Sequence, residues 1–121
     1  MKVAIPQWNG RVSPVLDAAH TLVLYEMTEH KIQGQTLLSV KIGDHLVRTR
    51  WLQSLGVDTL ICGALSKSLE RTLAPTGITV IPFICGKTEE VIEAYIAGQL
   101  GEKDFRLPGY TEHGYTEQEE Q

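Results

Sequence analysis

The chain has few cysteines, no long apolar run and no secretory signal, and each shortage excludes a class of protein. Its two cysteines, Cys62 and Cys85, are too few for a disulfide framework, so both are expected to stay reduced. No segment approaches the roughly 20 consecutive apolar residues that a membrane-spanning helix needs. The N-terminal residues lack the charged, apolar and cleavage regions of a signal peptide. We therefore expect a cytoplasmic protein with no membrane partner.

Excess positive charge is also missing. The chain carries 11 Lys and Arg against 15 Asp and Glu, for a net charge of −4. Four of the acids lie in residues 110–121, which contain no Lys or Arg, so residues 1–109 are neutral. A neutral body without a basic stripe excludes nucleic acid as a partner. The sequence predicts one domain over 1–109 and an acidic, disordered tail over 110–121.

Apolar and β-branched runs predict five strands. The first ends at Pro6, and a polar loop follows it as far as Pro14. The second and third strands are separated by a turn-like break and predict a hairpin. Pro82 lies inside the last run and indicates a strand at the edge of the sheet. The five runs are residues 2–5, 21–27, 31–40, 58–62 and 78–84.

Helical periodicity predicts three helices in the second half of the chain. The first covers about 44–55 and is capped by Gly56. The second has Ser66 as its N-cap and ends at Gly77. The third is capped by Thr88. Their apolar positions are Leu46, Val47, Trp51, Leu52 and Leu55 in the first, Leu65, Leu69 and Leu73 in the second, and Val91, Ile92, Tyr95 and Ile96 in the third.

The order of these elements defines the fold class. A strand and a hairpin are followed by alternating helices and strands, which form right-handed crossovers and demand a parallel part of the sheet. The hairpin adds one antiparallel strand. We therefore predict an α/β protein in which a five-stranded mixed sheet carries helices on its faces, in three layers.

Several stretches together resemble the dinitrogenase iron–molybdenum cofactor biosynthesis family. They are Lys-Val-Ala-Ile-Pro at 2–6, Asn-Gly-Arg-Val-Ser-Pro at 9–14, Asp17, Gly-Val-Asp-Thr-Leu-Ile-Cys-Gly at 56–63, Gly-Ile-Thr-Val-Ile at 77–81 and Phe-Arg-Leu-Pro-Gly at 105–109. The resemblance implies a ribonuclease H-like fold with sheet order 3-2-1-4-5 and strand 2 antiparallel. It also implies a carrier or accessory protein for an iron–sulfur or molybdenum–sulfur cluster, with a cluster donor or acceptor protein as partner.

The chain departs from that family at positions where relatives offer metal ligands. Val15 and Leu16 stand where some relatives have a histidine, and Tyr110 stands where many have a cysteine. The fold name also suggests a nuclease, but such an enzyme needs several carboxylates around two metal ions. The first strand carries none, and Asp17 alone makes no such group, so we exclude nuclease activity.

The candidate ligand site is the edge of the sheet beyond the carboxyl ends of the parallel strands. The loops 6–14, 62–64 and 85–87 should meet there, with the helix start at 43–45 nearby. Glycine-rich turns and helix starts present N–H groups that favour an anion, and Arg11 adds positive charge. The predicted cofactor-binding residues are Asn9, Gly10, Arg11, Ser13, Gly63 and Gly86. The predicted metal ligands are Cys85, Cys62 and His45.

Several of these residues also have a purely structural interpretation. Cys62 fits core packing, and Cys85, before a helix start, is the stronger thiol. His45 could be an exposed residue near a cap, and Asn9-Gly10 a plain turn. Ser13 has no His–Asp pair near it in the sequence. Two thiols cannot complete a four-thiolate cluster, so a homodimer, histidine or backbone ligands would have to supply the rest.

Three hypotheses about function follow. The first is the cluster carrier. The second is a metal-free regulatory or interaction domain that recruits a partner through a sheet edge or the tail. An enzyme with Cys85 as nucleophile comes third because no base is paired with that thiol, and we expect no catalytic activity.

Overall fold

A computed structural model of the protein describes residues 1–101, 105–107, 110–111 and 114–115. The helices are α1 (His45–Ser54), α2 (Lys67–Leu73) and α3 (Thr88–Ile96), with short 3₁₀ turns η1 (Leu16–Ala18) and η2 (Ala74–Thr76). The strands are β1 (Lys2–Trp8), β2 (Arg11–Val12), β3 (Thr21–Thr28), β4 (Lys31–Ser39), β5 (Thr59–Ile61), β6 (Thr79–Ile81), β7 (Tyr110–Thr111) and β8 (Gly114–Tyr115).

The main sheet is mixed and open. Its strands lie in the order β4-β3-β1-β5-β6, with β2 paired to the end of β1. β5 runs parallel to β1 and β6 parallel to β5, whereas β3 is antiparallel to both β1 and β4. In the numbering of the predicted strands this is the order 3-2-1-4-5, so the predicted topology is confirmed. No helix in the described part of the chain is long and apolar enough to cross a membrane.

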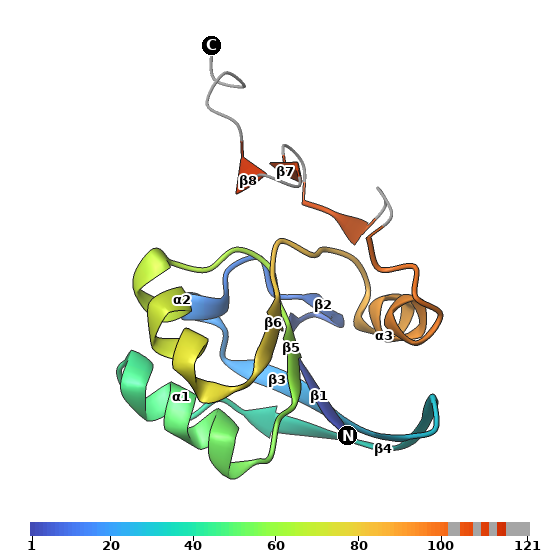
Figure 1. The fold of residues 1–121 in the computed structure, drawn as a ribbon, viewed down its shortest axis with the longest axis horizontal. Helices are drawn as coiled ribbons and strands as arrows, with labels where there is room; N and C mark the ends of the chain where they lie inside the picture. The colour runs from blue at the N-terminus through green and yellow to red at the C-terminus, as the bar shows by residue number, and fades with distance from the viewer. Residues whose placement is uncertain (102–104, 108–109, 112–113, 116–121) are drawn as a thin grey trace.

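Helices cover both faces of the sheet. Figure 1 shows α1 and α2 on one side of the sheet and α3 on the other. Because side chains alternate along a strand, Val3 and Ile5 pack in the cluster that contains α3, while Ala4 packs in the cluster that contains α1 and α2. The predicted three-layer arrangement is therefore present, with a separate apolar core on each face.

The first loop contains more regular structure than the sequence predicts. β1 continues past Pro6 to Trp8, because β2 turns back and pairs with it through Gln7–Val12 and Trp8–Arg11. Asn9 and Gly10 form the tight turn with φ angles of 52° and 76°, the combination that a two-residue hairpin favours. The prediction of a polar loop over 7–14 was therefore wrong for residues 7, 8, 11 and 12, which lie in strands, whereas the Asn-Gly turn is confirmed.

Two further boundaries differ from prediction. β6 ends at Ile81 rather than residue 84, directly before Pro82, which has no N–H to donate to a neighbouring strand. Its place at the edge of the sheet is as predicted. Thr88 does not cap α3: Lys87 occupies the N-cap position without a side-chain hydrogen bond, and the Thr88 hydroxyl donates to the Gly10 carbonyl.

The buried face of α1 also differs from prediction. Leu46 and Val47 are 49% and 38% exposed, and the buried positions are Thr49 and Leu52. The helix is turned so that its first apolar residues lie outside the core. By contrast, Ser66 caps α2 as predicted, since its hydroxyl accepts from the Leu69 N–H.

The tail was predicted to be disordered. Its described residues form the two-stranded pair β7 and β8, with Tyr110 opposite Tyr115. The remaining tail residues, 112–113 and 116–121, lie outside the described part of the chain, and so does the tail histidine, His113.

Candidate functional site

The three loops that were predicted to meet do so, and backbone hydrogen bonds join them. The Val12 N–H donates to the Gly86 carbonyl at 2.9 Å, and the Thr88 N–H donates to the Gly10 carbonyl at 2.9 Å. The Ala64 N–H donates to the Pro14 carbonyl at 2.9 Å. We call this region the loop edge: residues 6–14, 62–65 and 82–88. Several of its N–H groups bind neighbouring loops instead of pointing to a ligand.

Gly63 and Ser13 have structural roles at the loop edge. A Cβ atom on Gly63 would lie 2.5 Å from the Pro14 carbonyl oxygen and 2.6 Å from that of Ser13. Only glycine permits this approach of two backbones. Ser13 is 6% exposed, its N–H donates to the Pro6 carbonyl, and its hydroxyl donates to the Val15 carbonyl. Contact with a ligand is not needed to explain either residue.

Two positive side chains lie side by side on the loop edge. Arg11 and Lys87 face each other in an isolated antiparallel bridge, and both are exposed. Like charges directly opposite each other destabilise a pair of strands. Lys87 is also the residue before the first turn of α3. This arrangement favours an anion placed between the two side chains.

Cys85 lies in the same loop and is half-buried. Its N–H donates to the Phe105 carbonyl and its thiol to the Arg106 carbonyl, the latter at 3.4 Å. Gly86, the next residue, has a φ of 122°, which only glycine adopts readily. Cys85 is therefore the half-buried predicted metal ligand in the loop that also holds Lys87, two residues further along the chain.

Cys62 is fully buried. Burial, followed by the nearby charges of Asp17 and Glu70, raises the pKa of its thiol to about 12. At neutral pH it remains protonated, and a metal ligand must be a thiolate. The packing interpretation accounts for this residue.

His45 belongs to a different group of side chains, which we call the polar cluster: Asp17, His45, Ser66 and Ser68. His45 Nε2 lies 3.2 Å from Asp17 Oδ2, and His45 Nδ1 lies 3.0 Å from Ser68 Oγ. Ser66 donates to Asp17 through its N–H at 2.9 Å and its hydroxyl at 2.6 Å. Arg48 donates to the Asp17 carbonyl. The cluster thus ties η1 to the starts of α1 and α2.

The charge of Asp17 is favoured by these partners. Burial alone raises the pKa of its carboxyl, but the hydrogen bonds from Ser66 and the interaction with His45 outweigh burial, and the pKa is lowered. In the described part of the chain, no three His, Cys, Asp or Glu side chains come together as a metal site. The three predicted ligands therefore do not form one centre.

The polar cluster was not predicted as a group. Asp17 and Ser66 are 49 residues apart, and His45 and Ser68 are 23 residues apart. The sequence indicated Ser66 as a cap and His45 as a helix start. Only the packing of α1 against α2 brings them together, and no spacing rule contains that information.

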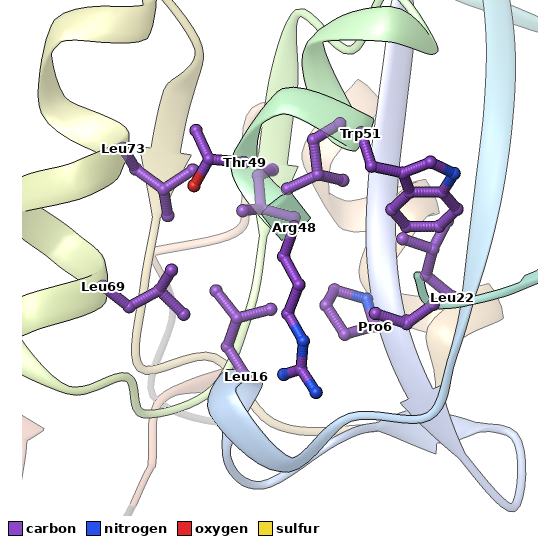
Figure 2. Close-up of a pocket in the computed structure, with 11 residues that line it drawn as sticks. Pro6, Leu16, Leu22, Arg48, Thr49, Trp51, Leu69 and Leu73 are labelled. Carbon is purple, nitrogen blue, oxygen red and sulfur yellow. The ribbon is translucent and has the colours of Figure 1, made fainter. Parts of the chain in front are cut away.

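A small cavity lies between α1, α2 and the sheet. Figure 2 shows Leu16, Leu22, Leu69 and Leu73 around it, with Thr49 and Arg48 reaching in from α1. Its volume is about 20 Å³, which is room for little more than one water molecule. Thr49 Oγ1 and Arg48 Nε are buried without a hydrogen-bond partner among the described residues. The cavity is too small to hold an organic ligand or a cluster.

Comparisons with solved structures agree with this fold. A protein identified as PH0822 aligns with a TM-score of 0.76 at 20% identity, over 82% of this chain and 91% of that chain. A protein described as a dinitrogenase from Methanocaldococcus jannaschii aligns with a TM-score of 0.69 at 14% identity, over 82% and 90%. A protein described as a NifB protein from Thermotoga aligns with a TM-score of 0.65 at 24% identity, over 81% and 89%.

A comparison with curated proteins finds no match. The profile of a protein family described as dinitrogenase iron-molybdenum cofactor matches residues 1–98, which include both the loop edge and the polar cluster. With the sheet order and the neighbouring structures, this match shows that the chain belongs to the dinitrogenase iron–molybdenum cofactor family.

Proposed function

We propose that this protein is an accessory protein of metal–sulfur cofactor assembly that holds an anionic metal–sulfur species, as cargo, at the loop edge. The observation that carries the proposal is the exposed pair Arg11 and Lys87, which face each other across a backbone bridge in the loop that also holds Cys85. An anion between them removes their mutual repulsion. Binding alone is proposed there, without chemical change of the cargo.

The set of donor atoms limits how such a cargo is held. Cys85 is the one thiol at the loop edge that is partly accessible, since Cys62 is buried with a pKa of about 12. One thiolate cannot complete the ligands of a four-thiolate cluster. A cargo that carries its own sulfide ligands fits better, because positive side chains and one thiol can hold it from outside. A donor or acceptor protein, or a second copy of the chain, would supply further ligands.

Membership of the family supports the same proposal. Two structural neighbours are described as a dinitrogenase and a NifB protein, names that refer to nitrogenase and its cofactor. At these identities the likeness shows the fold alone. The role of the loop edge therefore depends on the local arrangement of charge and thiol.

Titration with tetrathiomolybdate without oxygen, followed by absorption spectroscopy and metal analysis, tests the proposal. The double variant Arg11→Ala/Lys87→Ala should bind at least about tenfold more weakly, equivalent to about 1.4 kcal/mol. The control is Lys41→Ala/Arg50→Ala, which removes two exposed positive charges before and within α1. Cys85→Ser tests direct ligation, because loss of the thiol should change the charge-transfer spectrum.

If the two double variants bound tetrathiomolybdate equally well, the proposal would be contradicted, because the positive charges at the loop edge would then contribute no more to binding than those near α1. A wild-type protein that takes up neither thiomolybdate nor an iron–sulfur cluster on reconstitution would also contradict it. That result would favour the metal-free interaction domain.

A further inference from the structure

The polar cluster contains a hydroxyl, an imidazole and a carboxylate in the order that nucleophilic catalysis needs: a nucleophile, a base and a group that orients the base. None of these residues belongs to the loop edge. Ser68 Oγ lies 3.0 Å from His45 Nδ1, and His45 Nε2 lies 3.2 Å from Asp17 Oδ2. Both distances are within the reach that nucleophilic catalysis requires. We propose that Ser68 is a base-activated nucleophile and that this site hydrolyses small carboxylic esters.

Asp17 fixes the histidine in the state that a general base needs. Its carboxylate is held by the N–H and hydroxyl of Ser66, and its lowered pKa keeps it charged. A charged carboxylate accepts from His45 Nε2–H, so the other ring nitrogen, Nδ1, carries the free lone pair. That nitrogen faces Ser68, whose hydroxyl then donates to it.

The nucleophile is accessible to a small molecule. Ser68 is exposed in the first turn of α2 and borders an open hollow of about 460 Å³. The hollow is open to solvent, so a small molecule can reach the Ser68 hydroxyl from outside. Arg48 also borders the hollow and adds a positive charge to its wall. The Thr72 hydroxyl donates to the Ser68 carbonyl at 2.9 Å and adds a further tie to that turn.

The proposed reaction proceeds in two balanced steps. Ser68 Oγ bonds to the ester carbonyl carbon while its proton passes to His45 Nδ1. The bond from that carbon to the alcohol oxygen then breaks, and the alcohol leaves with the proton from His45. Water attacks the acyl-serine, gives a proton to His45, and releases the carboxylic acid while Ser68 regains its hydrogen. The sum is ester plus water to acid plus alcohol.

The test is reaction of the full-length protein with a fluorophosphonate probe, which forms a phosphonyl–serine bond and releases fluoride. Mass spectrometry of the digested protein locates the adduct. We expect it on Ser68 in the folded protein and not in protein unfolded by urea. His45→Gln should slow labelling about 10²-fold, the lower end of what a general base contributes. Ser54→Ala is the matched control, because it removes another exposed serine hydroxyl, on α1.

A parallel assay measures hydrolysis of p-nitrophenyl acetate. Ser68→Ala should abolish the acyl-serine detected by mass spectrometry, and Ser54→Ala should leave it unchanged. Labelling of Ser68 at the same rate in folded and unfolded wild-type protein would overturn the proposal without any variant. Labelling independent of His45, in a variant with the wild-type melting temperature, would do so too. Either result would leave the polar cluster as a structural tie only.

Discussion

Gly63 is a residue at which two loops of the candidate site approach each other closely. Its missing Cβ leaves room for the carbonyl oxygens of Ser13 and Pro14, which such an atom would meet at 2.6 and 2.5 Å. Both contacts are with backbone, which cannot rotate away as a side chain does. Gly63→Ala should therefore lower the free energy of unfolding by about 1–3 kcal/mol, as overpacking of a filled site does. Urea denaturation measures this change.

The matched control for that substitution is Gly34→Ala, at a glycine in β4. A Cβ atom there meets nothing within 4 Å, and the backbone is in the ordinary extended conformation. Its effect should stay within about 0.5 kcal/mol. If Gly63→Ala and Gly34→Ala lowered the free energy of unfolding equally, close packing would not be the reason for glycine at position 63.

Thr49 is a second residue whose side chain should have a measurable effect on the free energy of unfolding. It is 2% exposed, and its hydroxyl has no hydrogen-bond partner among the described residues. An unsatisfied buried hydroxyl costs about 1–3 kcal/mol. Thr49→Val keeps the shape and removes the hydroxyl, so it should stabilise the fold by about 1 kcal/mol in urea denaturation. Thr36→Val, at an exposed position of β4, is the control. Destabilisation by Thr49→Val would show that the hydroxyl is satisfied in solution.

At the scale of elements, Asp17 joins three pieces of structure. It lies in η1, receives two hydrogen bonds from the N-cap of α2, and contacts His45 at the start of α1. The pKa of Asp17 is lowered in the fold from 3.8, because the Ser66 hydrogen bonds and His45 outweigh burial. At pH values near and below 3.8, the Asp17 carboxyl therefore binds a proton more readily in the unfolded state than in the folded state.

This shift predicts a pH dependence of stability. The contribution of Asp17 is fully present above the unfolded pKa of about 3.8 and is lost as pH falls through the lower folded value. Asp17→Asn should therefore lower the melting temperature at pH 6 and lessen its fall between about pH 4 and pH 2. Glu70→Gln, a neutralised acid on α2, is the control for charge alone. Identical pH profiles for wild type and Asp17→Asn would contradict this role.

The elements also show where sequence patterns succeed and where they fail. The cap at Ser66 and the turn at Asn9-Gly10 are local, so the sequence predicted them. β2 was missed because two residues form no pattern, and its strand exists through pairing with the end of β1. The exposed face of α1 was missed because Leu46 and Val47 are apolar but lie at its first turn, outside the core.

At the scale of the whole molecule, the order of the strands could be predicted but the grouping of side chains could not. The strand order β4-β3-β1-β5-β6 was predicted from short apolar runs, from the crossovers and from the family resemblance. The meeting of the loops followed from that order. The pairing of Arg11 with Lys87, and of His45 with Asp17, depends on loop geometry and helix packing. The prediction that Cys85, Cys62 and His45 are metal ligands was made without that information.

The most direct measurement of the central claim is a nuclear magnetic resonance titration of the labelled protein with tetrathiomolybdate in the absence of oxygen. We expect the amide signals of Gly10, Gly86 and Thr88 to shift as the tetrathiomolybdate concentration rises, because these residues flank Arg11 and Lys87. The signals of His45 and Ser68 should stay in place. Shifts confined to the polar cluster, or no shifts at all, would contradict the placement of a metal–sulfur anion at the loop edge.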